Sequence, residues 1–490
     1  MIDPEAFRRE AHRVADWIAD YLRDLGRYPV QPQVRPGSIR EQVPSRPPEQ
    51  GDSFDRLMQD FERLVVPGLT HWNHPGFYGY FPANTSPPSM LAEMLVAGLG
   101  VQCMSWSTSP AATELEQAMM EWLRQMIGLP EGFTGVIQDT ASTATLVALI
   151  TARDRKVAGR QDGRTAANLS SAERRAPSAE GRAPSINHLV VYTSEEANVS
   201  VPKGARLAGI RPDHIRLVET DEHAAMRLAA LERAVMEDRA AGLVPCAVVA
   251  TVGTTGTTAI DPVPAIAELC RREEIWLHVD AAFAGSAAIL PEMRWILAGA
   301  EQADSLVFNP HKWLLVNFDC SAYFVRDPGA LLGSFGSSAE ILRSAQDPQV
   351  VNYRDWGIQL GRRFRALKLW FVIRSYGLEG LRSILREHIR LGKLFASWVD
   401  QDPRFERIGE AELATVCFRQ EEGGRRKEEG DRLNRELLER VNRSGRAFLT
   451  GTRLKGRFVL RLSLGRLTST EEHLRQSWAL IQETAASLSR

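Results

Sequence analysis

The sequence predicts an α/β fold in which helices flank both faces of a mainly parallel sheet. The first observation is an alternation of strand-like and helical segments through the middle of the chain, with strands expected at residues 188–192, 247–252, 275–280 and 306–308. Such alternation is typical of parallel sheets with helical crossovers. The second observation is that chemically useful polar side chains follow the ends of these segments. Because sheets of this kind bind ligands at the carboxyl ends of their strands, we expect the functional site there.

The composition sets limits on size, partners and location. With 490 residues, the chain is long enough for two or three domains. Its 60 basic and 61 acidic residues balance, so neither a nucleic acid nor a membrane is an expected partner. The 5 cysteines are scattered without metal-binding spacing, and their odd number argues against a disulfide framework. No apolar run approaches the ~20 residues that cross a bilayer, and the first residues open a charged helix, so we expect a cytoplasmic protein.

The first eighty or so residues predict two helices and an aromatic segment. A helical period of apolar residues runs over residues 7–25, and a second helix is expected at 54–64. The proline-rich connector between them, residues 28–48, is expected to contain no helix. Residues 71–82 combine aromatic side chains with helix breakers, which favours the wall of an apolar substrate pocket. The two histidines of this segment have no cysteine or carboxylate spaced to join them, so no metal site is expected.

Residues 135–145 predict a strand, a turn rich in hydroxyl side chains and the start of a helix that runs on to Ala152. Small residues at a helix start leave backbone N–H groups available to hold a phosphate, and neighbouring hydroxyls add donors. A simple Thr or Ser N-cap is the alternative interpretation. The phosphate interpretation is favoured because a lysine and an aspartate with matching chemistry occur further along the chain.

That aspartate and that lysine follow two neighbouring strand-like segments. Asp280 ends one buried apolar segment, and Lys312 lies in a proline-containing turn directly after the next. Trp313 and Leu314 partly shield the lysine from water, which favours a neutral amine, and a neutral amine is a nucleophile toward aldehydes. The alternative is a surface lysine beside an unrelated strand-end aspartate. It is disfavoured because both groups lie at strand ends of one region rich in strand–helix–strand units.

Pyridoxal phosphate is the aldehyde cofactor that matches this pair. Its protonated ring nitrogen needs a buried carboxylate partner, which Asp280 can supply. Ala282 leaves a small, flat surface on which the ring can lie. The sequence therefore predicts that Lys312 attaches the cofactor and that Asp280 pairs with the ring nitrogen.

The segments 309–313 (Asn-Pro-His-Lys-Trp) and 317–322 (Asn-Phe-Asp-Cys-Ser-Ala) resemble the pyridoxal-phosphate-dependent group II amino-acid decarboxylases, and among them the aromatic-L-amino-acid decarboxylases. The resemblance runs along nearly the whole chain. It implies PLP fold type I, as in aspartate aminotransferase, with a seven-stranded sheet. It also implies a homodimer with the active site at the subunit interface and a small amino acid as substrate. Three parts are implied: a helical arm and dimerisation segment at 1–86, a large cofactor-binding domain at 87–367 and a small C-terminal α/β domain at 368–490.

The resemblance also implies roles for individual residues. The catalytic positions that it implies are Lys312, Asp280, Asn198 and Ile341. The implied cofactor-binding residues are mostly small or polar and comprise Thr140, Ala141, Ser142, Asn198, Thr255, Asp280, Ala282, Asn309, His311 and Lys312. The implied substrate pocket is partly aromatic and comprises Trp72, Phe77, Tyr78, Phe81, Ala83, Gln102, Met104 and Gly361. Gly361 lies where the family's pocket is trimmed to admit large rings.

Two of these positions depart from the family's pattern. The family has a His that stacks on the cofactor ring where this chain has Asn198, and Asn brings neither an imidazole face nor a proton that titrates near neutrality. Counting without gaps from Lys312, Ile341 falls where the family's catalytic loop has a Tyr that donates a proton after CO2 leaves. Isoleucine has no proton to give. Family branches that act as aldehyde synthases replace this Tyr or have Asn at the stacking position.

These features predict a carboxy-lyase that converts an aromatic L-amino acid to its amine, with tryptophan, tyrosine, phenylalanine or dihydroxyphenylalanine as the substrate class. One alternative is an aromatic aldehyde synthase, which uses O2 and yields aldehyde, ammonia, CO2 and hydrogen peroxide. A second alternative is a homologue that binds the cofactor but has lost turnover, and the intact Lys312, Asp280 and Thr255 argue against it. An acidic substrate such as glutamate is disfavoured by the aromatic segment 72–81.

Overall fold

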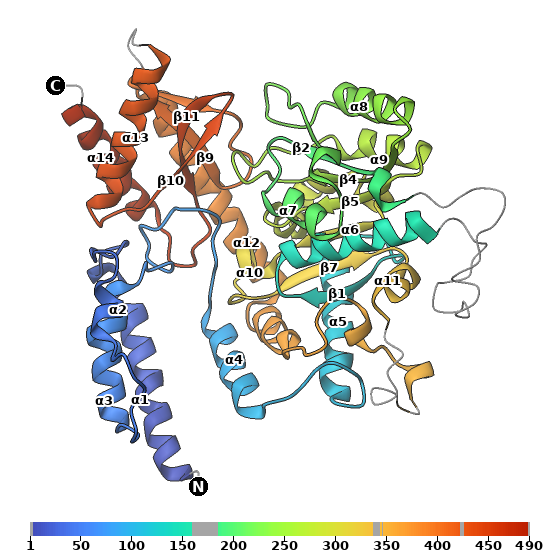
Figure 1. The fold of residues 1–490 in the computed structure, drawn as a ribbon. Helices are drawn as coiled ribbons and strands as arrows, with labels where there is room; N and C mark the ends of the chain where they lie inside the picture. The colour runs from blue at the N-terminus through green and yellow to red at the C-terminus, as the bar shows by residue number, and fades with distance from the viewer. Residues whose placement is uncertain (1–2, 159–184, 337–343, 345, 422–425, 489–490) are drawn as a thin grey trace. The chain divides into compact units, whose positions relative to one another are not determined.

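The computed structural model describes residues 3–158, 185–336, 344, 346–421 and 426–488 (Figure 1). The chain divides into two compact units. The terminal unit consists of Met1–Pro82, Leu391–Ile408 and Val416–Arg490, and the central unit of Ala83–Arg390 and Gly409–Thr415. The expected three-part division of the chain stays a prediction.

The sheet of the central unit has seven strands in the order β1-β7-β6-β5-β4-β2-β3. In the described part of the chain, β7 is the one strand that runs antiparallel to its neighbours, and the other adjacent pairs are parallel. The predicted α/β class with a mainly parallel seven-stranded sheet is therefore confirmed. The strands are β1 (Thr134–Gln138), β2 (Leu189–Ser194), β3 (Ile215–Val218), β4 (Val244–Thr251), β5 (Trp276–Asp280), β6 (Ser305–Phe308) and β7 (Ser321–Val325).

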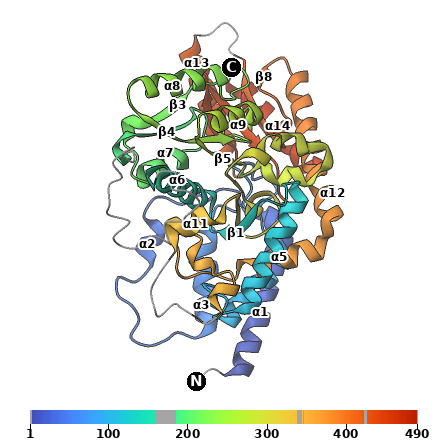
Figure 2. The same cartoon turned by 90° about the vertical axis from the view of Figure 1, so that its right-hand side faces the viewer.

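Helices cover both faces of this sheet (Figures 1 and 2). The crossover through α7 moves from β2 to the edge strand β3, and the crossover through α8 returns past β2 to β4. Because both crossovers are right-handed by rule, they place their helices on opposite faces. The helices of the central unit are α4 (Pro87–Leu99), α5 (Pro110–Ile127), α6 (Ala141–Ala158), α7 (Ser200–Leu207), α8 (Leu228–Ala240), α9 (Val263–Arg272), α10 (Pro310–Trp313), α11 (Pro328–Phe335) and residues 365–390 of α12 (Arg365–Gln401).

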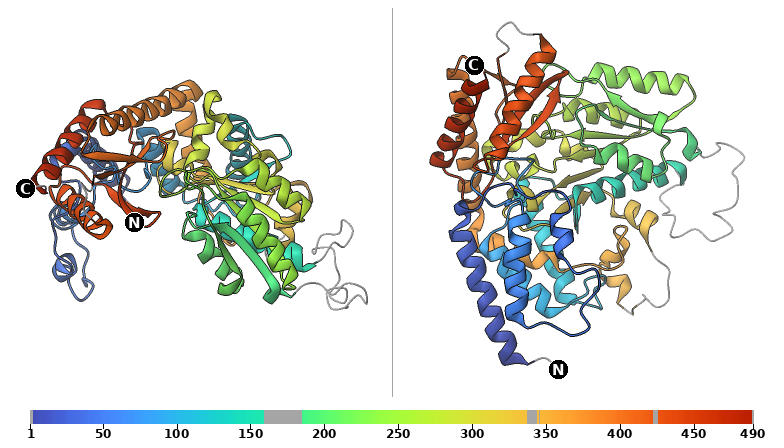
Figure 3. Two further views of the ribbon diagram at one scale, coloured as in Figure 1. Left: turned by 90° about the horizontal axis from the view of Figure 1, so that it is seen from above. Right: turned by 60° about the vertical axis from the view of Figure 1, so that its left-hand side comes forward.

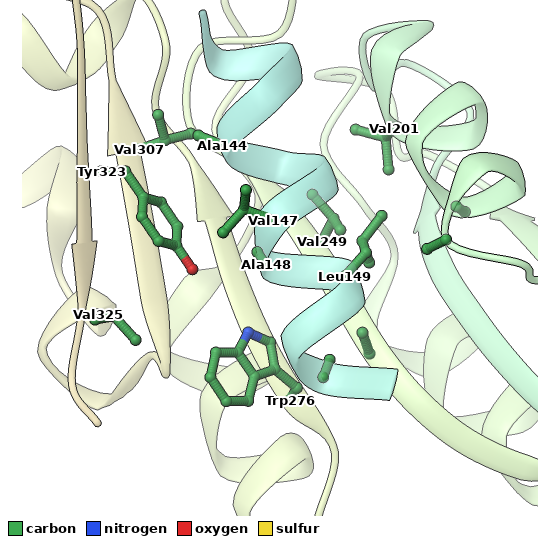
Figure 4. Close-up of a cluster of buried hydrophobic side chains, with 14 of the residues drawn as sticks. Ala144, Val147, Ala148, Leu149, Val201, Val249, Trp276, Val307, Tyr323 and Val325 are labelled. Atoms are coloured by element: carbon green, nitrogen blue, oxygen red, sulfur yellow. The ribbon is translucent and has the colours of Figure 1, made fainter. Parts of the chain in front are cut away.

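Helix α6 packs closely on the sheet because its inner face is made of small residues. Ala144, Val147 and Ala148 are fully buried and lie in one cluster with Val307 of β6 and Tyr323 of β7 (Figure 4). The chain passes from β1 into α6 through a turn of two residues, so the N-terminus of α6 lies at the carboxyl end of β1. Since β1 runs in the same direction as β5 and β6, this helix start shares the edge of the sheet where their carboxyl ends lie.

The terminal unit combines helices with a four-stranded sheet in the order β10-β11-β9-β8 (Figure 3). The pairs β10–β11 and β8–β9 are antiparallel. Among the described helices of the whole chain, none has both the length and the apolarity needed to span a bilayer. The helices and strands of this unit are α1 (Pro4–Arg23), α2 (Ser38–Gln42), α3 (Phe54–Asp60), residues 391–401 of α12, β8 (Phe405–Ile408), β9 (Thr415–Gln420), α13 (Lys427–Arg443), β10 (Thr450–Leu454), β11 (Arg457–Ser463) and α14 (Glu471–Leu488).

The expectation of no helix in the proline-rich connector is wrong, because α2 forms within it. The five residues of α2 contain no proline, so nothing in them removes a backbone donor. Gly37 precedes the helix with a φ of 90°, a left-handed conformation that glycine adopts without steric cost. Proline density over a long segment therefore did not exclude a single helical turn between two prolines.

Candidate active site at the carboxyl ends of the central strands

Asp280 is the last residue of β5 and is buried, with 4% of its surface exposed. Its Oδ1 accepts a hydrogen bond from the N–H of Ala282 at 3.0 Å. Among the residues that the structure describes, none donates a hydrogen bond to Oδ2. Burial raises the pKa of Asp280 above its ordinary value, while the positive charge of Lys312 and the Ala282 N–H act in the opposite direction. The site therefore presents a buried acid with one oxygen available and an amine within electrostatic range.

Lys312 lies in α10, the short helix that follows β6, and its side chain is half-buried. The backbone of Asn309 ties this turn to the end of β5, because its N–H donates to Ala282 O at 3.0 Å and its O accepts from Lys312 N at 2.9 Å. The Asn309 side chain accepts a hydrogen bond from the Ser321 hydroxyl at 2.6 Å. The predicted set Asp280, Ala282, Asn309 and Lys312 is thus brought together by adjacent strand ends.

His311 is buried beside Lys312, and its position fixes its tautomer. Its Nδ1 accepts a hydrogen bond from the N–H of Cys320 at 2.9 Å, so the neutral ring carries its proton on Nε2. Burial and, to a smaller extent, the positive charge of Lys312 lower the pKa of His311 to about 3. The imidazole is therefore a neutral group whose Nε2–H can act as a donor.

A segment that the sequence did not single out holds the lysine turn from another side. The Asn84 side chain donates to Lys312 O at 2.8 Å, and the Asn84 N–H donates to His311 O at 3.2 Å. Two residues later, the Ser86 hydroxyl donates to Leu315 O at 2.8 Å. Asn84 and Lys312 are 228 positions apart, and no local pattern marks the contact. The polar run before the prolines of α4 was the one available hint, and it is typical of any helix start.

The hydroxyl-rich turn between β1 and α6 matches both interpretations given to it. Thr140 Oγ1 accepts a hydrogen bond from the N–H of Thr143 at 3.3 Å, which is the N-cap interaction. In the described part of the chain, the N–H groups of Ala141 and Ser142 donate no hydrogen bond to the protein. The cap therefore satisfies one donor and leaves two neighbouring donors at the start of α6 available to an anion.

Asn198 and Thr255 meet at the ends of β2 and β4. The Asn198 Nδ2 donates to Thr255 Oγ1 at 3.0 Å, and the Asn198 Oδ1 accepts from the N–H of Ser200 at 2.9 Å. The second bond anchors the Asn198 side chain to the start of α7. Both ends of the Asn198 amide are therefore engaged by the protein.

Three of the residues predicted for the substrate pocket lie together in the central unit. The N–H of Arg362 donates to Gln102 Oε1 at 2.5 Å, and Met104 O accepts from the N–H of Arg354 at 2.8 Å. A Cβ at Gly361 would lie 3.2 Å from Gln102 Nε2, closer than an ordinary contact. A side chain at position 361 would therefore press directly on Gln102.

The predicted aromatic wall belongs to the terminal unit, where its members differ in exposure. Phe77 and Tyr78 are each 1% exposed, and Phe77 stacks on Phe448 with ring centroids 5.2 Å apart. Trp72 is 37% exposed. Phe81 is buried, and Ala83 begins the central unit. Ile341 lies outside the described residues.

The residues gathered in the central unit fit pyridoxal phosphate. Asp280 offers a buried acid with an available oxygen, which suits a basic ring nitrogen, and Lys312 offers an amine for an aldehyde. The unbonded N–H groups of Ala141 and Ser142 suit a phosphate at the start of α6. The donor set therefore matches the cofactor group by group.

The chain is similar in sequence to a known protein family and to known enzymes. Residues 36–421 match the family described as the pyridoxal-dependent decarboxylase conserved domain. The chain is 42% identical to the aromatic-L-amino-acid decarboxylase of Rattus norvegicus over 499 residues, which cover 100% of this chain and 99% of the relative. It is 41% identical to the phenylacetaldehyde synthase of Arabidopsis thaliana over 497 residues, which cover 99% of this chain and 97% of the relative.

The fold is also shared with a solved structure. The crystal structure of Oryza sativa TDC with PLP and tryptamine superposes with a TM-score of 0.93 at 36% identity and covers 100% of this chain and 99% of that one. The expected PLP fold type I is thereby confirmed. Because the family match spans most of the chain and the relatives align along its whole length, the chain belongs to the pyridoxal-dependent decarboxylases and is a PLP-dependent enzyme.

Proposed function

We propose that the protein is a carboxy-lyase that removes CO2 from an aromatic L-amino acid to give the amine. The observation that carries the proposal is the pairing of a buried acid, Asp280, with the amine of Lys312 at adjacent strand ends. The similarity to an aromatic-L-amino-acid decarboxylase and to a phenylacetaldehyde synthase, two enzymes named for aromatic substrates or products, supports the substrate class.

When bound, pyridoxal phosphate supplies an electron sink for the pair of electrons that CO2 leaves on the α-carbon. Lys312 would attach the cofactor through its amine, and Asp280 would hold a proton at the ring nitrogen. Ala141 and Ser142 would bind the phosphate through their N–H groups, with Thr140 beside them. Ala282 would leave room for the ring, and Asn309 would keep Ala282 and the lysine turn in register.

We further propose a homodimer whose interface includes an exposed apolar face of α4. Leu91, Leu95 and Leu99 follow each other at intervals of four residues and are 57%, 49% and 60% exposed. Residues four apart share one face of a helix, so the three side chains form a continuous apolar stripe. Covering that stripe with a second copy would bury it and is consistent with a site completed between subunits.

A second candidate function is the aldehyde synthase, and Asn198 is the observation that favours it. The balanced reaction converts amino acid, O2 and H2O to aldehyde, CO2, NH3 and H2O2. Both reactions release CO2, and the choice between amine and aldehyde depends on how quickly the α-carbon then receives a proton. The amide of Asn198 is engaged by Thr255 and Ser200 and has no proton that titrates near neutral pH. Slow proton delivery leaves more time for O2 to react.

One set of assays tests both candidates. The holoenzyme is incubated separately with tryptophan, tyrosine, phenylalanine and dihydroxyphenylalanine while CO2, amine, peroxide and oxygen uptake are followed. Amine without peroxide or oxygen uptake supports the carboxy-lyase alone, and aldehyde with stoichiometric peroxide supports the synthase. Absorbance of the bound cofactor without CO2 release from any of the four would contradict both and leave the inactive homologue.

A substitution sharpens the choice between the two candidates. Asn198→His is expected to raise the amine fraction of the products, because it supplies an imidazole at the ring-stacking position. Asn187→His is the matched control, since Asn187 is exposed on the 3-10 turn Ile186–His188 before β2. An unchanged product ratio in Asn198→His would remove Asn198 from the account of product choice.

A further inference from the structure

His278 is a fully buried imidazole that the proposed reaction does not use. It lies on β5, two residues before Asp280, and therefore on the same face of the strand. Its Nδ1 lies 2.9 Å from Ser305 Oγ at the start of β6, and its Nε2 lies 3.3 Å from Thr145 Oγ1 of α6. One side chain thus joins two strands of the sheet to the helix that covers them.

The partners of His278 are themselves held in place. The indole N–H of Trp276 donates to the same Ser305 Oγ at 3.0 Å, so β5 and β6 are linked twice at this point. Trp276 and Tyr323 lie beside α6 in Figure 4, among the apolar residues beneath the helix. Burial lowers the pKa of His278 to about 3, so the ring is neutral and keeps one donor and one acceptor nitrogen at ordinary pH.

The contact with Thr145 lies near both ends of the proposed cofactor site. Thr145 is four residues, or about one helical turn, after Ala141, whose N–H is available to the phosphate. His278 is two residues, or roughly 7 Å along the strand, before the acid proposed for the ring nitrogen. The hydrogen bond between them therefore spans the gap between the element that holds the ring and the element that holds the phosphate.

In the described part of the chain, the other contacts between the first turns of α6 and the sheet have no comparable directionality. The polar contacts of Arg155 and Lys156 with Asp304, Trp276 and Glu274 lie at the opposite, C-terminal end of the helix. Ala144, Val147 and Ala148 are small and apolar, and apolar contact depends on buried area with little preference for direction. A hydrogen bond requires a defined distance and angle. The His278–Thr145 contact is therefore the directional contact that can fix the position of the first turns of α6 along the strands.

We propose that His278 is a positioning residue that, through Thr145, sets the spacing between Asp280 and the first turn of α6, so that one pyridoxal phosphate reaches both. The inference rests on the proposed roles of Asp280 and Ala141. If it holds, the affinity gained by binding the ring and the phosphate together depends on this spacing. A ligand that uses one end alone does not depend on the spacing, whereas a ligand that uses both ends does.

The test compares two ligands on the full-length protein after removal of its cofactor. Dissociation constants are measured for pyridoxal phosphate and for pyridoxal, which lacks the phosphate. The ratio of the pyridoxal constant to the pyridoxal phosphate constant reports the gain in affinity from engaging both ends of the site. Thr145→Val removes the hydroxyl at nearly constant volume and is expected to lower this ratio about tenfold, which corresponds to one lost hydrogen bond of about 1.4 kcal/mol. Thr145→Ser keeps the hydroxyl and is expected to retain the wild-type ratio.

Thr151→Val is the matched control on the same helix. Thr151 is also buried, but its hydroxyl donates to Val147 O of its own helix at 2.9 Å and does not link α6 to the sheet. If Thr145 contributes only to folding stability, Thr145→Val and Thr151→Val should both lower the melting temperature. Each should then reduce the affinities for pyridoxal phosphate and pyridoxal by the same factor. His278→Gln, whose amide can reach Thr145, provides an independent variant with an expected ratio between those of wild type and Thr145→Val.

The outcomes separate this inference from the proposed function. If the wild-type chain binds pyridoxal phosphate and Thr145→Val has the same ratio as wild type and Thr151→Val, the positioning role is wrong and the function stands. If the wild-type chain binds pyridoxal phosphate no more tightly than pyridoxal, the start of α6 is not a phosphate site. The proposed function then loses that assignment, and the positioning role fails with it. A ratio that falls in Thr145→Val and stays in Thr145→Ser and Thr151→Val supports the inference.

Discussion

Two buried aspartates at the same edge of the sheet differ in how many backbone N–H groups they bind. Asp261 is 1% exposed and Asp280 is 4% exposed, and burial raises the pKa of both. Asp261 accepts hydrogen bonds from the N–H groups of Met226 and Thr251, each at 2.7 Å. Asp280 accepts one, from Ala282, and lies within electrostatic range of Lys312.

The difference lies in what the backbone leaves available. Both oxygens of Asp261 are taken by the protein, so this carboxylate fastens the end of β4 to a neighbouring loop. Asp280 keeps one oxygen without a donor among the described residues and has a cation nearby. A buried acid with spare acceptor capacity costs free energy unless a ligand completes it. Spare capacity, more than burial, therefore distinguishes the proposed catalytic acid from the structural one.

The largest effect is expected from removing the amine of Lys312, whose charge acts on Asp280. Lys312→Arg keeps the charge but cannot attach an aldehyde, so CO2 release should fall by about a thousandfold or more. Borohydride reduction followed by peptide mass spectrometry should label Lys312 in wild type. Lys368→Arg is the control, because Lys368 is also buried, has a pKa lowered to about 8 and lies 3.1 Å from Glu93. Labelling at Lys368 in place of Lys312 would show that Lys312 does not attach the cofactor and that Asp280 has a different partner from the one proposed.

Asp280→Asn should lower turnover by about a hundredfold to a thousandfold with little loss of folding stability. The amide has nearly the same shape but cannot hold a proton at the ring nitrogen, and each pKa unit of lost stabilisation is worth about 1.4 kcal/mol. Turnover and thermal unfolding of wild type and variant measure the two effects separately. A variant that keeps wild-type turnover would show that the available oxygen of Asp280 has no catalytic use.

Asp261→Asn is expected to give the opposite pattern, with a loss of stability and a retained cofactor absorbance. One amide oxygen replaces two carboxylate oxygens, so one of the N–H groups of Met226 and Thr251 faces an NH2 group and loses its acceptor. The free energy of unfolding should fall by about 1–3 kcal/mol. Urea denaturation measures it, and a variant as stable as wild type would contradict the structural role.

The stability of the wild-type chain should also depend on pH through Asp261. The pKa of this carboxyl is raised from 3.8 to about 6, so the folded state holds a proton that the unfolded chain has lost in this interval. The stabilising contribution is complete below pH 3.8 and is lost as pH rises through about 6. The free energy of unfolding of wild type, minus that of Asp261→Asn, should therefore decrease over this window and then level off. A flat difference would mean that the folded pKa is not raised.

The smallest effect is expected at an exposed carboxylate. Arg386 lies 2.7 Å from Glu292 and lowers its pKa to about 2, but the two side chains are 46% and 51% exposed. Solvent screens such pairs, so Glu292→Gln should change the free energy of unfolding by about 0.5 kcal/mol or less. Thermal unfolding at low and high salt checks this value. A larger loss would show that a short distance outweighs exposure in this protein.

Prediction from the sequence succeeded where the signal was local. The apolar run of β5 ends at Asp280, and the turn after β6 contains Lys312, so two short patterns were enough to place an acid and an amine at strand ends. The helix of the connector was missed because proline density was averaged over twenty residues, whereas α2 occupies five of them. The contacts of Asn84 with the lysine turn and of His278 with Thr145 were missed because each joins positions more than a hundred residues apart.

The sequence by itself determined the class of fold, the order of its central elements and the chemical types available at the strand ends, because periodicity and residue type are local properties. Only the tertiary structure decided which N–H groups and oxygens remain available after packing. Asp261 and Asp280 are the same residue type at ends of neighbouring segments, and the sequence does not say which of them backbone donors saturate. That depends on loops brought in from elsewhere in the chain, and hydrogen-bond partners exist only once those loops are in place.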